Sequence, residues 1–131
     1  MEVPILKQGN YLIASIQSAL SDSDLAQLRD ALVERVGRLR SRGVIIDLTA
    51  LDILDSFATR TLRDTAHMIR LRGAETVIVG MQPEVAFTMV QLGLSLPDIA
   101  TALDLEEGLI YLGRKTRPRE VPRARGQTGE Q

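Results

Sequence analysis

The sequence predicts an α/β domain with a mixed sheet, antiparallel in its amino-terminal hairpin and otherwise largely parallel, with about four helices packed on it. Short runs of β-branched residues alternate with longer segments in which apolar residues recur every three or four positions. That alternation is typical of strands joined by right-handed helical crossovers. The length of 131 residues suits a single domain with one hydrophobic core.

The chain begins with two predicted strands, at residues 4–7 and 11–17. Between them lies the turn Gln8-Gly9-Asn10, in which Gly9 and Asn10 both tolerate a positive φ angle. This combination favours a β-hairpin, which would add an antiparallel edge to the sheet.

An amphipathic helix is predicted to follow from Ser21. The run Ser-Asp-Ser-Asp at residues 21–24 offers side-chain acceptors and negative charge to a helix amino end. Gly43 is expected to close the helix as its carboxyl-terminal cap. The apolar residues that recur at helical spacing are Leu25, Leu28, Leu32, Val36 and Leu39.

The central strand is predicted at residues 44–48, where the apolar run fits a strand covered on both faces. A turn rich in carboxylates follows, and then a helix in which Ser56 stands directly behind Asp55. Because this helix starts where a parallel strand ends, its first residues lie at the sheet edge that carries functional groups in open α/β folds. Gly73 is expected to end the helix.

The remaining elements are shorter. The pattern predicts a strand at 76–79, a helix opened by Pro83 and ended by Gly93, an edge strand at 99–102 and a final helix at 105–112. The folded domain is therefore assigned to residues 1–113 and a basic, disordered tail to residues 114–131. Six basic and two acidic residues give the tail a charge of +4, and the whole chain carries −1, so residues 1–113 carry −5. A solubilising extension is the simplest interpretation of the tail.

The composition excludes several classes of function. The chain has no cysteine and one histidine, which excludes disulfides, thiolate zinc sites and multi-histidine metal sites. Aromatic residues make up 3%, too few for the base-stacking modules that bind nucleic acid. No stretch approaches the roughly 20 apolar residues of a membrane span, and no secretory signal is visible. We therefore expect a cytoplasmic protein with neither nucleic acid nor membrane as a partner.

Catalysis by Ser56 and His67 is not expected. They lie eleven residues apart on one predicted helix, about 16 Å along its axis, whereas a nucleophile and its base need roughly 3 Å. His67 instead falls at helical spacing with Arg60, Arg63 and Arg70, in a polar stripe on the outer side of the helix.

A metal site is the second catalytic alternative. Asp47, Asp52 and Asp55 are three carboxylates at a strand edge and could hold Mg²⁺ in an enzyme. Aspartates are also the usual formers of turns and helix caps, and nothing else in the sequence resembles a magnesium enzyme. A glycine-rich phosphate loop is absent as well, so we expect no cofactor and no enzymatic activity.

Two roles remain open for Ser56. As a helix cap it would stabilise the domain by about 1 kcal/mol. As a phosphate acceptor it would gain a charge of about −1.5 to −2 at a helix amino end, where unpaired N–H groups favour an anion. Asp55 beside it, with Phe57 and Ala58 behind it, would offer a partner protein charged and apolar contacts.

Three segments carry a resemblance to a known family: VIIDLTALDILDSFATRTL, GAETVIVGMQPEVAFTMVQLGL and TALDLEEGL. They resemble the STAS domains of bacterial anti-sigma-factor antagonists, most closely the RsbS-type scaffold of the stressosome, over residues 3 to about 115. The most telling pieces are DSF at 55–57 and GMQPEVA at 80–86. In the wider family this helix usually opens with D-S-S-G or D-S-T-G. Asp55-Ser56-Phe57-Ala58 departs from that pattern, which favours the RsbS-like branch.

The resemblance implies a scaffold and phospho-switch in stress-response signalling. Such a protein assembles with itself and with sensor-bearing, RsbR-like STAS paralogues. It captures an RsbT-like serine/threonine switch kinase and releases it when the kinase phosphorylates the serine that matches Ser56, and a dedicated phosphatase resets it. A simple anti-sigma-factor antagonist that binds an anti-sigma kinase directly is the alternative. The implied partner-binding residues are Asp55, Ser56, Phe57, Ala58 and Arg60.

Overall fold

The computed structural model describes residues 3–93 and 99–116, and in this part of the chain the strands form one five-stranded sheet. Strands β1 and β2 pair antiparallel, whereas the later neighbours pair parallel, so the predicted mixed α/β sheet is confirmed. The strands, in their order across the sheet, are β1 (Ile5–Gln8), β2 (Tyr11–Ser15), β3 (Gly43–Asp47), β4 (Glu75–Val79) and β5 (Ala100–Ala102).

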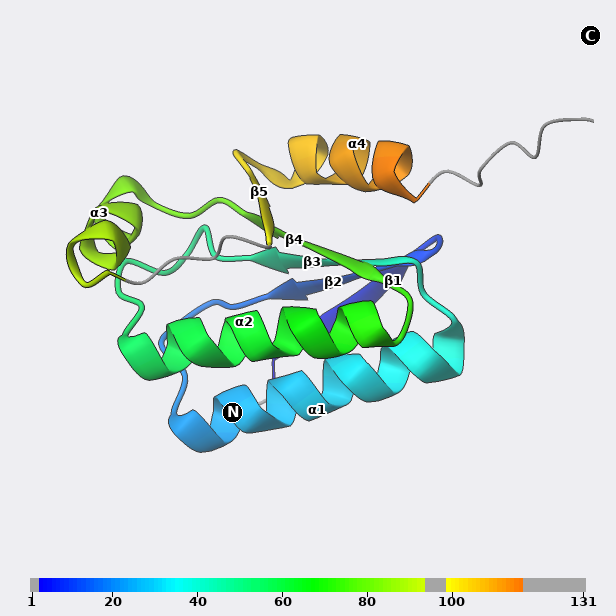
Figure 1. Cartoon of the computed structure of the whole chain (residues 1–131), viewed down its shortest axis with the longest axis horizontal. Helices are drawn as coiled ribbons and strands as arrows, with labels where there is room; N and C mark the ends of the chain where they lie inside the picture. The colour runs from blue at the N-terminus through cyan, green and yellow to red at the C-terminus, as the bar shows by residue number, and fades with distance from the viewer. Residues whose placement is uncertain (1–2, 94–98, 117–131) are drawn as a thin grey trace, which may run out of the picture.

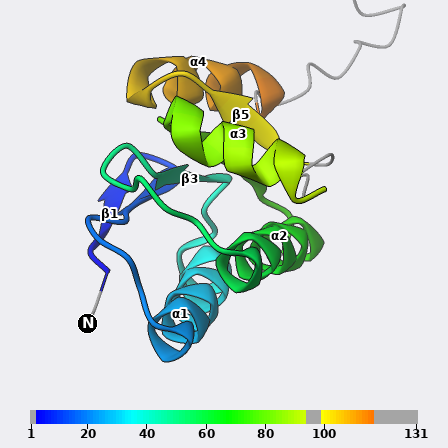
Figure 2. The same cartoon turned by 90° about the vertical axis from the view of Figure 1, so that its left-hand side faces the viewer.

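The helices cover both faces of this sheet and one of its ends. Helices α1 (Asp22–Leu39) and α2 (Ser56–Leu71) lie side by side on one face, and α4 (Leu105–Lys115) lies on the other (Figure 1). Helix α3 (Pro83–Gln91) stands beyond the carboxyl ends of the strands, at the end of the sheet where α2 begins (Figure 2). This end carries the candidate site.

Strand β3 lies at the centre of the core. Its residues alternate between the two faces, so Val44 and Ile46 pack towards α1 and α2, and Ile45 packs towards α4. All three are fully buried, which confirms the prediction of a strand covered on both faces. On the α4 side the buried cluster consists of Ile13, Ile45, Val77, Val79 and Leu112.

Helix α1 has the predicted start but not the predicted end. Ser21 and Asp24 form a capping box, in which the Asp24 N–H donates to Ser21 Oγ at 3.0 Å. The helix ends at Leu39, and Arg40 takes the left-handed conformation with φ of 52°. The expectation that Gly43 caps the helix was wrong, because Gly43 begins β3. A Cβ on this residue would lie 2.8 Å from Leu112 Cδ1, so the glycine allows α4 to pack closely on the sheet.

Helix α4 is longer than the sequence predicts. It continues through Gly113 to Lys115, so the first two residues assigned to the tail are helical. Residues 117–131 of the predicted tail, and residues 94–98 before β5, lie outside the described residues. Thr116 ties the end of α4 to the residue directly before β3, because its carbonyl oxygen accepts a hydrogen bond of 2.9 Å from Arg42 Nη1.

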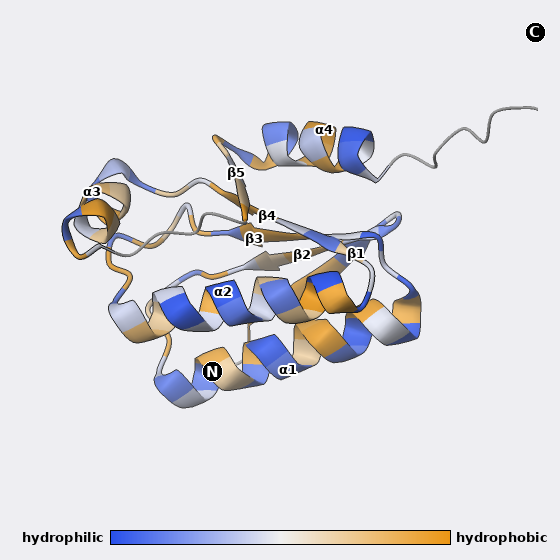
Figure 3. Ribbon diagram, in the orientation of Figure 1, coloured by the Kyte–Doolittle hydropathy of each residue, from blue (hydrophilic) through white to orange (hydrophobic). Residues whose placement is uncertain are grey.

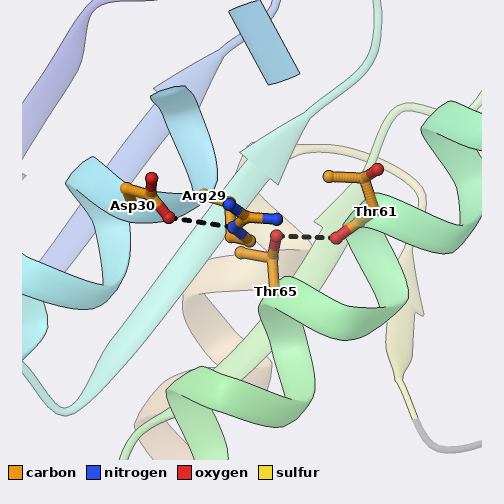
Figure 4. Close-up of polar contacts among 4 residues, drawn as sticks. All are labelled: Arg29, Asp30, Thr61 and Thr65. Carbon is orange, nitrogen blue, oxygen red and sulfur yellow. Dashed lines mark hydrogen bonds and ion pairs between the residues drawn. The ribbon is translucent and has the colours of Figure 1, made fainter. Parts of the chain in front are cut away.

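Helix α2 buries three threonines, Thr59, Thr61 and Thr65, among its apolar residues. Two of their hydroxyls donate to backbone carbonyls one turn earlier, Thr65 Oγ1 to Thr61 O at 2.7 Å (Figure 4) and Thr59 Oγ1 to Asp55 O at 2.9 Å. This bonding satisfies polar groups that burial would otherwise penalise. Hydrophilic and hydrophobic segments alternate along α1 and α2, as helices with one buried face require (Figure 3). None of the described helices is long and apolar enough to cross a membrane.

Candidate functional site at the start of helix α2

Two loops meet at the carboxyl end of the sheet. The first, residues 48–55, joins β3 to α2, and the second, residues 80–82, joins β4 to α3. The side-chain amide of Gln82 donates a hydrogen bond to the carbonyl of Thr49 at 2.7 Å. This contact ties the loop that precedes α2 to the loop that precedes α3.

The base of the first loop is a turn made by Asp47 and Thr49. Asp47 Oδ1 accepts hydrogen bonds from the backbone N–H of Thr49 at 2.9 Å and from its hydroxyl at 2.6 Å. Gly80 packs directly against this turn with φ of +75°, and a Cβ there would collide with Thr49 Oγ1. Glycine is required at this position both for the backbone angle and for the close approach of the loops.

Asp55, rather than Ser56, caps helix α2. Asp55 has an extended backbone, and its Oδ1 accepts a hydrogen bond from the N–H of Ala58 at 2.8 Å. Ser56 is the first helical residue and is half-buried. Within the described part of the chain no group forms a hydrogen bond with its hydroxyl. The interpretation of Ser56 as the cap was therefore wrong, and the cap belongs to its neighbour.

The backbone around Ser56 favours a negative charge. The N–H groups of Ser56 and Phe57 find no acceptor among the residues that the structure describes, since no helical carbonyl precedes them. Asp55 accepts instead from the N–H groups of Ala58 and Thr59. Helix α2 adds the partial positive charge of its amino end. The carboxylate of Asp55 opposes this field at short range, so the start of the helix carries competing charges.

The surface beside Ser56 is apolar on one side. Ile53 is 69% exposed and Phe57 is 37% exposed, whereas Leu51 and Leu54 anchor the same loop in the core. Ala58 is 7% exposed and packs in the core, so little of its side chain is accessible to a partner. Arg60 and His67 are exposed, as are Asp55 and Arg70, while Arg63 is half-buried.

The structure keeps apart the residues of both catalytic alternatives. Helix α2 is continuous from Ser56 to Leu71, so Ser56 and His67 remain three turns apart and form no dyad. Asp47, Asp52 and Asp55 do not gather into a group, since the described residues contain no cluster of three metal-ligating side chains. Asp47 and Asp55 instead accept the turn and cap hydrogen bonds described above.

The hollow that Asp55 lines is small. It has a volume of about 60 Å³ and is lined mainly by apolar side chains, including Ile53 and Leu54. Small-molecule pockets are typically about 300 Å³ or more. The candidate site is therefore an exposed surface suited to a protein partner.

The sequence predicted Asp55, Ser56 and Phe57 as residues of this surface, but two of its features were not predicted. It did not assign a role to Ile53, which looks like any apolar residue of a loop. It also missed the hydrogen bond from Gln82 to Thr49, which joins residues 33 positions apart. The sequence signal that could have revealed this close approach of the two loops is Gly80, a glycine directly after a buried strand.

Residues 2–107 match the family model described as the STAS domain. A serine-to-glutamate variant of RsbS from Moorella thermoacetica is 35% identical, with a TM-score of 0.77, over 88% of this chain and 98% of that one. A chain from the structure of the stressosome, described as a signal integration and transduction hub, is 33% identical with a TM-score of 0.71. That match covers 88% of this chain and 100% of the other.

A relative in Bacillus subtilis is the RsbT co-antagonist protein RsbRA. It is 25% identical over 107 residues, which cover 82% of this chain and 38% of RsbRA. The present chain thus spans under two fifths of the length of that relative. The resemblance is confined to one segment of the larger protein.

Proposed function

Because the chain belongs to the STAS domain family, we propose that it is a non-enzymatic stressosome scaffold and phospho-switch in stress-response signalling. In this role it captures a serine/threonine switch kinase through the surface around Ser56. Phosphorylation of Ser56 by that kinase then releases the kinase, and a phosphatase restores the first state.

The observation that carries this proposal is the division of roles between Asp55 and Ser56. Asp55 caps α2, whereas Ser56 is half-buried and its hydroxyl holds no structural hydrogen bond with any described residue. A phosphate on this hydroxyl would therefore alter the surface without removing the cap from the helix. A phosphorylation switch must change the surface while it preserves the fold, and this arrangement meets that condition.

The physical effect of the phosphate follows from its neighbours. It would add a charge of about −1.5 to −2 next to the carboxylate of Asp55 and beside the exposed side chains of Ile53 and Phe57. A partner that buries these apolar side chains would have to strip water from the phosphate, which is costly unless the partner supplies matching cations. The charge thus disfavours the interface that the unmodified surface forms.

The identities of the partners rest on the relatives. Similarity to RsbS and to a stressosome chain supports assembly with itself and with STAS paralogues. Similarity to an RsbT co-antagonist supports an RsbR-like paralogue and an RsbT-like kinase as partners. The alternative, a simple antagonist that binds an anti-sigma kinase directly, predicts a small complex with one partner. Sedimentation of the protein with its kinase and paralogue distinguishes the two.

The experiment that tests the modification is phosphate mapping. The protein is incubated with ATP and the switch kinase encoded nearest to it, and intact mass and peptide mapping follow. We expect one phosphate on Ser56, its loss in Ser56→Ala and its retention in Ser23→Ala, which removes an exposed serine of α1. Phosphate on another residue, or none, would contradict the proposed switch.

A further inference from the structure

A row of basic side chains runs along one flank of α2. Its members stand three or four residues apart, which places them on the same side of the helix. The row, here called the basic stripe, consists of Arg60, Arg63, His67 and Arg70. Asp64 lies 3.9 Å from Arg63, and Glu75 lies 4.0 Å from Arg70. The long, exposed pair with Asp64 neutralises little of the charge of Arg63.

The basic stripe faces away from α1. Met68 lies on the other flank of α2, where it lines a hollow together with Val33 and Glu34 of α1. Neither α1 nor the sheet covers the stripe, because the residues that α2 buries lie at other helical positions. Leu71 follows His67 by one turn and is 87% exposed. The stripe therefore combines positive charge with one large apolar side chain.

The first turn of α4 has the opposite character. Its carboxylates are Asp104, Glu106 and Glu107, and all three are exposed. Leu103 next to them is 76% exposed. The basic residues of α4 come in its last turn, well away from this group. This group, here called the acidic turn, is complementary in charge and in apolar character to the basic stripe.

One molecule cannot join these two surfaces. Helix α2 packs on one face of the sheet and α4 on the other, so the sheet separates the basic stripe from the acidic turn (Figures 1 and 2). Each copy of the chain presents both surfaces outward. The surfaces can meet only between different copies.

We propose that the basic stripe of one copy docks on the acidic turn of a second copy of this chain. The contact buries Leu71 against Leu103 and pairs the Arg63 guanidinium with the Glu106 carboxylate. Because two different surfaces meet, each copy can bind one neighbour through α2 and another through α4, and such head-to-tail contacts extend into rings, shells or filaments. This inference rests on the proposed scaffold role and names the surfaces by which copies would assemble.

The test is a charge swap read by sedimentation velocity of the unphosphorylated full chain at low ionic strength. Arg63→Glu and Glu106→Arg each place like charges in every contact between identical copies, so each variant alone should associate about tenfold more weakly than the parent chain. In an equal mixture every contact can again pair opposite charges. The mixture should therefore recover the association that both variants lose. Arg38→Glu makes the same charge change on the exposed side of α1 and should leave association unchanged.

Three outcomes would overturn the inference. The parent chain could remain monomeric at low ionic strength, the mixture could fail to recover, or kinase binding alone could respond to Arg63→Glu, which would make the stripe a kinase surface. Ser56 phosphorylation is mapped in the same variants. Normal phosphorylation without the charge-swap pattern would refute this contact and leave the proposed switch intact, whereas a charge-swap pattern without phosphorylation would do the reverse.

Discussion

The carboxylate of Asp55 accepts a hydrogen bond of 2.8 Å from the backbone N–H of Ala58 and so caps helix α2 in front of Ser56. The two neighbouring residues thereby have separate tasks. Asp55 stabilises the start of the helix, and Ser56 presents a hydroxyl that no other described residue binds. The proposed switch depends on this separation.

Substitution of each residue tests the separation directly. Asp55→Ala removes the cap and should lower the free energy of unfolding by about 1 kcal/mol. Ser56→Ala removes no hydrogen bond that the structure contains and should change that free energy by less than about 0.5 kcal/mol. Urea denaturation followed by circular dichroism measures both. A larger loss of stability from Ser56→Ala than from Asp55→Ala would show that Ser56 caps the helix.

The packing of the two loops makes a second prediction. Gly80→Ala forces a left-handed backbone onto alanine and drives its Cβ into Thr49 Oγ1, so we expect a loss of about 2–4 kcal/mol in stability. Gly93→Ala is the matched control, because Gly93 has φ of +70° but open space around its Cβ position. It should cost only about 1–2 kcal/mol. Equal losses in thermal or urea unfolding would show that the contact with Thr49 contributes nothing.

The end of the folded domain gives a third prediction. Thr116 accepts from Arg42 through its carbonyl, and its hydroxyl donates to Leu112 O at 2.6 Å. A chain that stops after residue 113 loses both hydrogen bonds and should be less stable by about 1–3 kcal/mol. A chain that stops after residue 116 keeps both hydrogen bonds and should retain the stability of the full chain within about 0.5 kcal/mol. Equal stability of the two truncated chains would place the end of the folded domain at residue 113.

Much of the fold could be predicted because the apolar periods are clear. Leu25, Leu28, Leu32 and Val36 recur at helical spacing, and all four are buried in α1. Helix ends were harder to predict. Several adjacent residues can cap a helix, so the sequence could not decide between Asp55 and Ser56. Gly43 was predicted to cap α1. Its observed role depends on close packing against Leu112, which lies far along the chain and cannot be inferred from the local sequence.

The candidate site was also predictable in part. The position of Ser56 at the carboxyl edge of the sheet follows from the order of strand and helix. Exposure at this edge does not follow from local pattern, since Ile53 is 69% exposed and Ala58 is buried although both are apolar. Tertiary packing decides which of them a partner can reach.

The exposed apolar side chains beside Ser56 give a fourth prediction. Ile53→Asp places a charge on the surface that the kinase is proposed to cover and should weaken kinase binding about tenfold or more. Leu6→Asp is the control, because Leu6 is similarly exposed, at 64%, on strand β1 at the sheet edge. It should leave kinase binding unchanged. Titration calorimetry measures both, and equal effects would remove Ile53 from the proposed interface.

The most direct test of the switch is the affinity of the kinase for the two forms of the protein. Calorimetry compares the unmodified protein with protein phosphorylated on Ser56, and Ser56→Ala treated with ATP and kinase serves as the control. We predict that the phosphate weakens kinase binding by about 5- to 150-fold, the usual range for coupled sites, while Ser56→Ala retains full affinity. Equal affinity of the phosphorylated and unmodified proteins would contradict the switch.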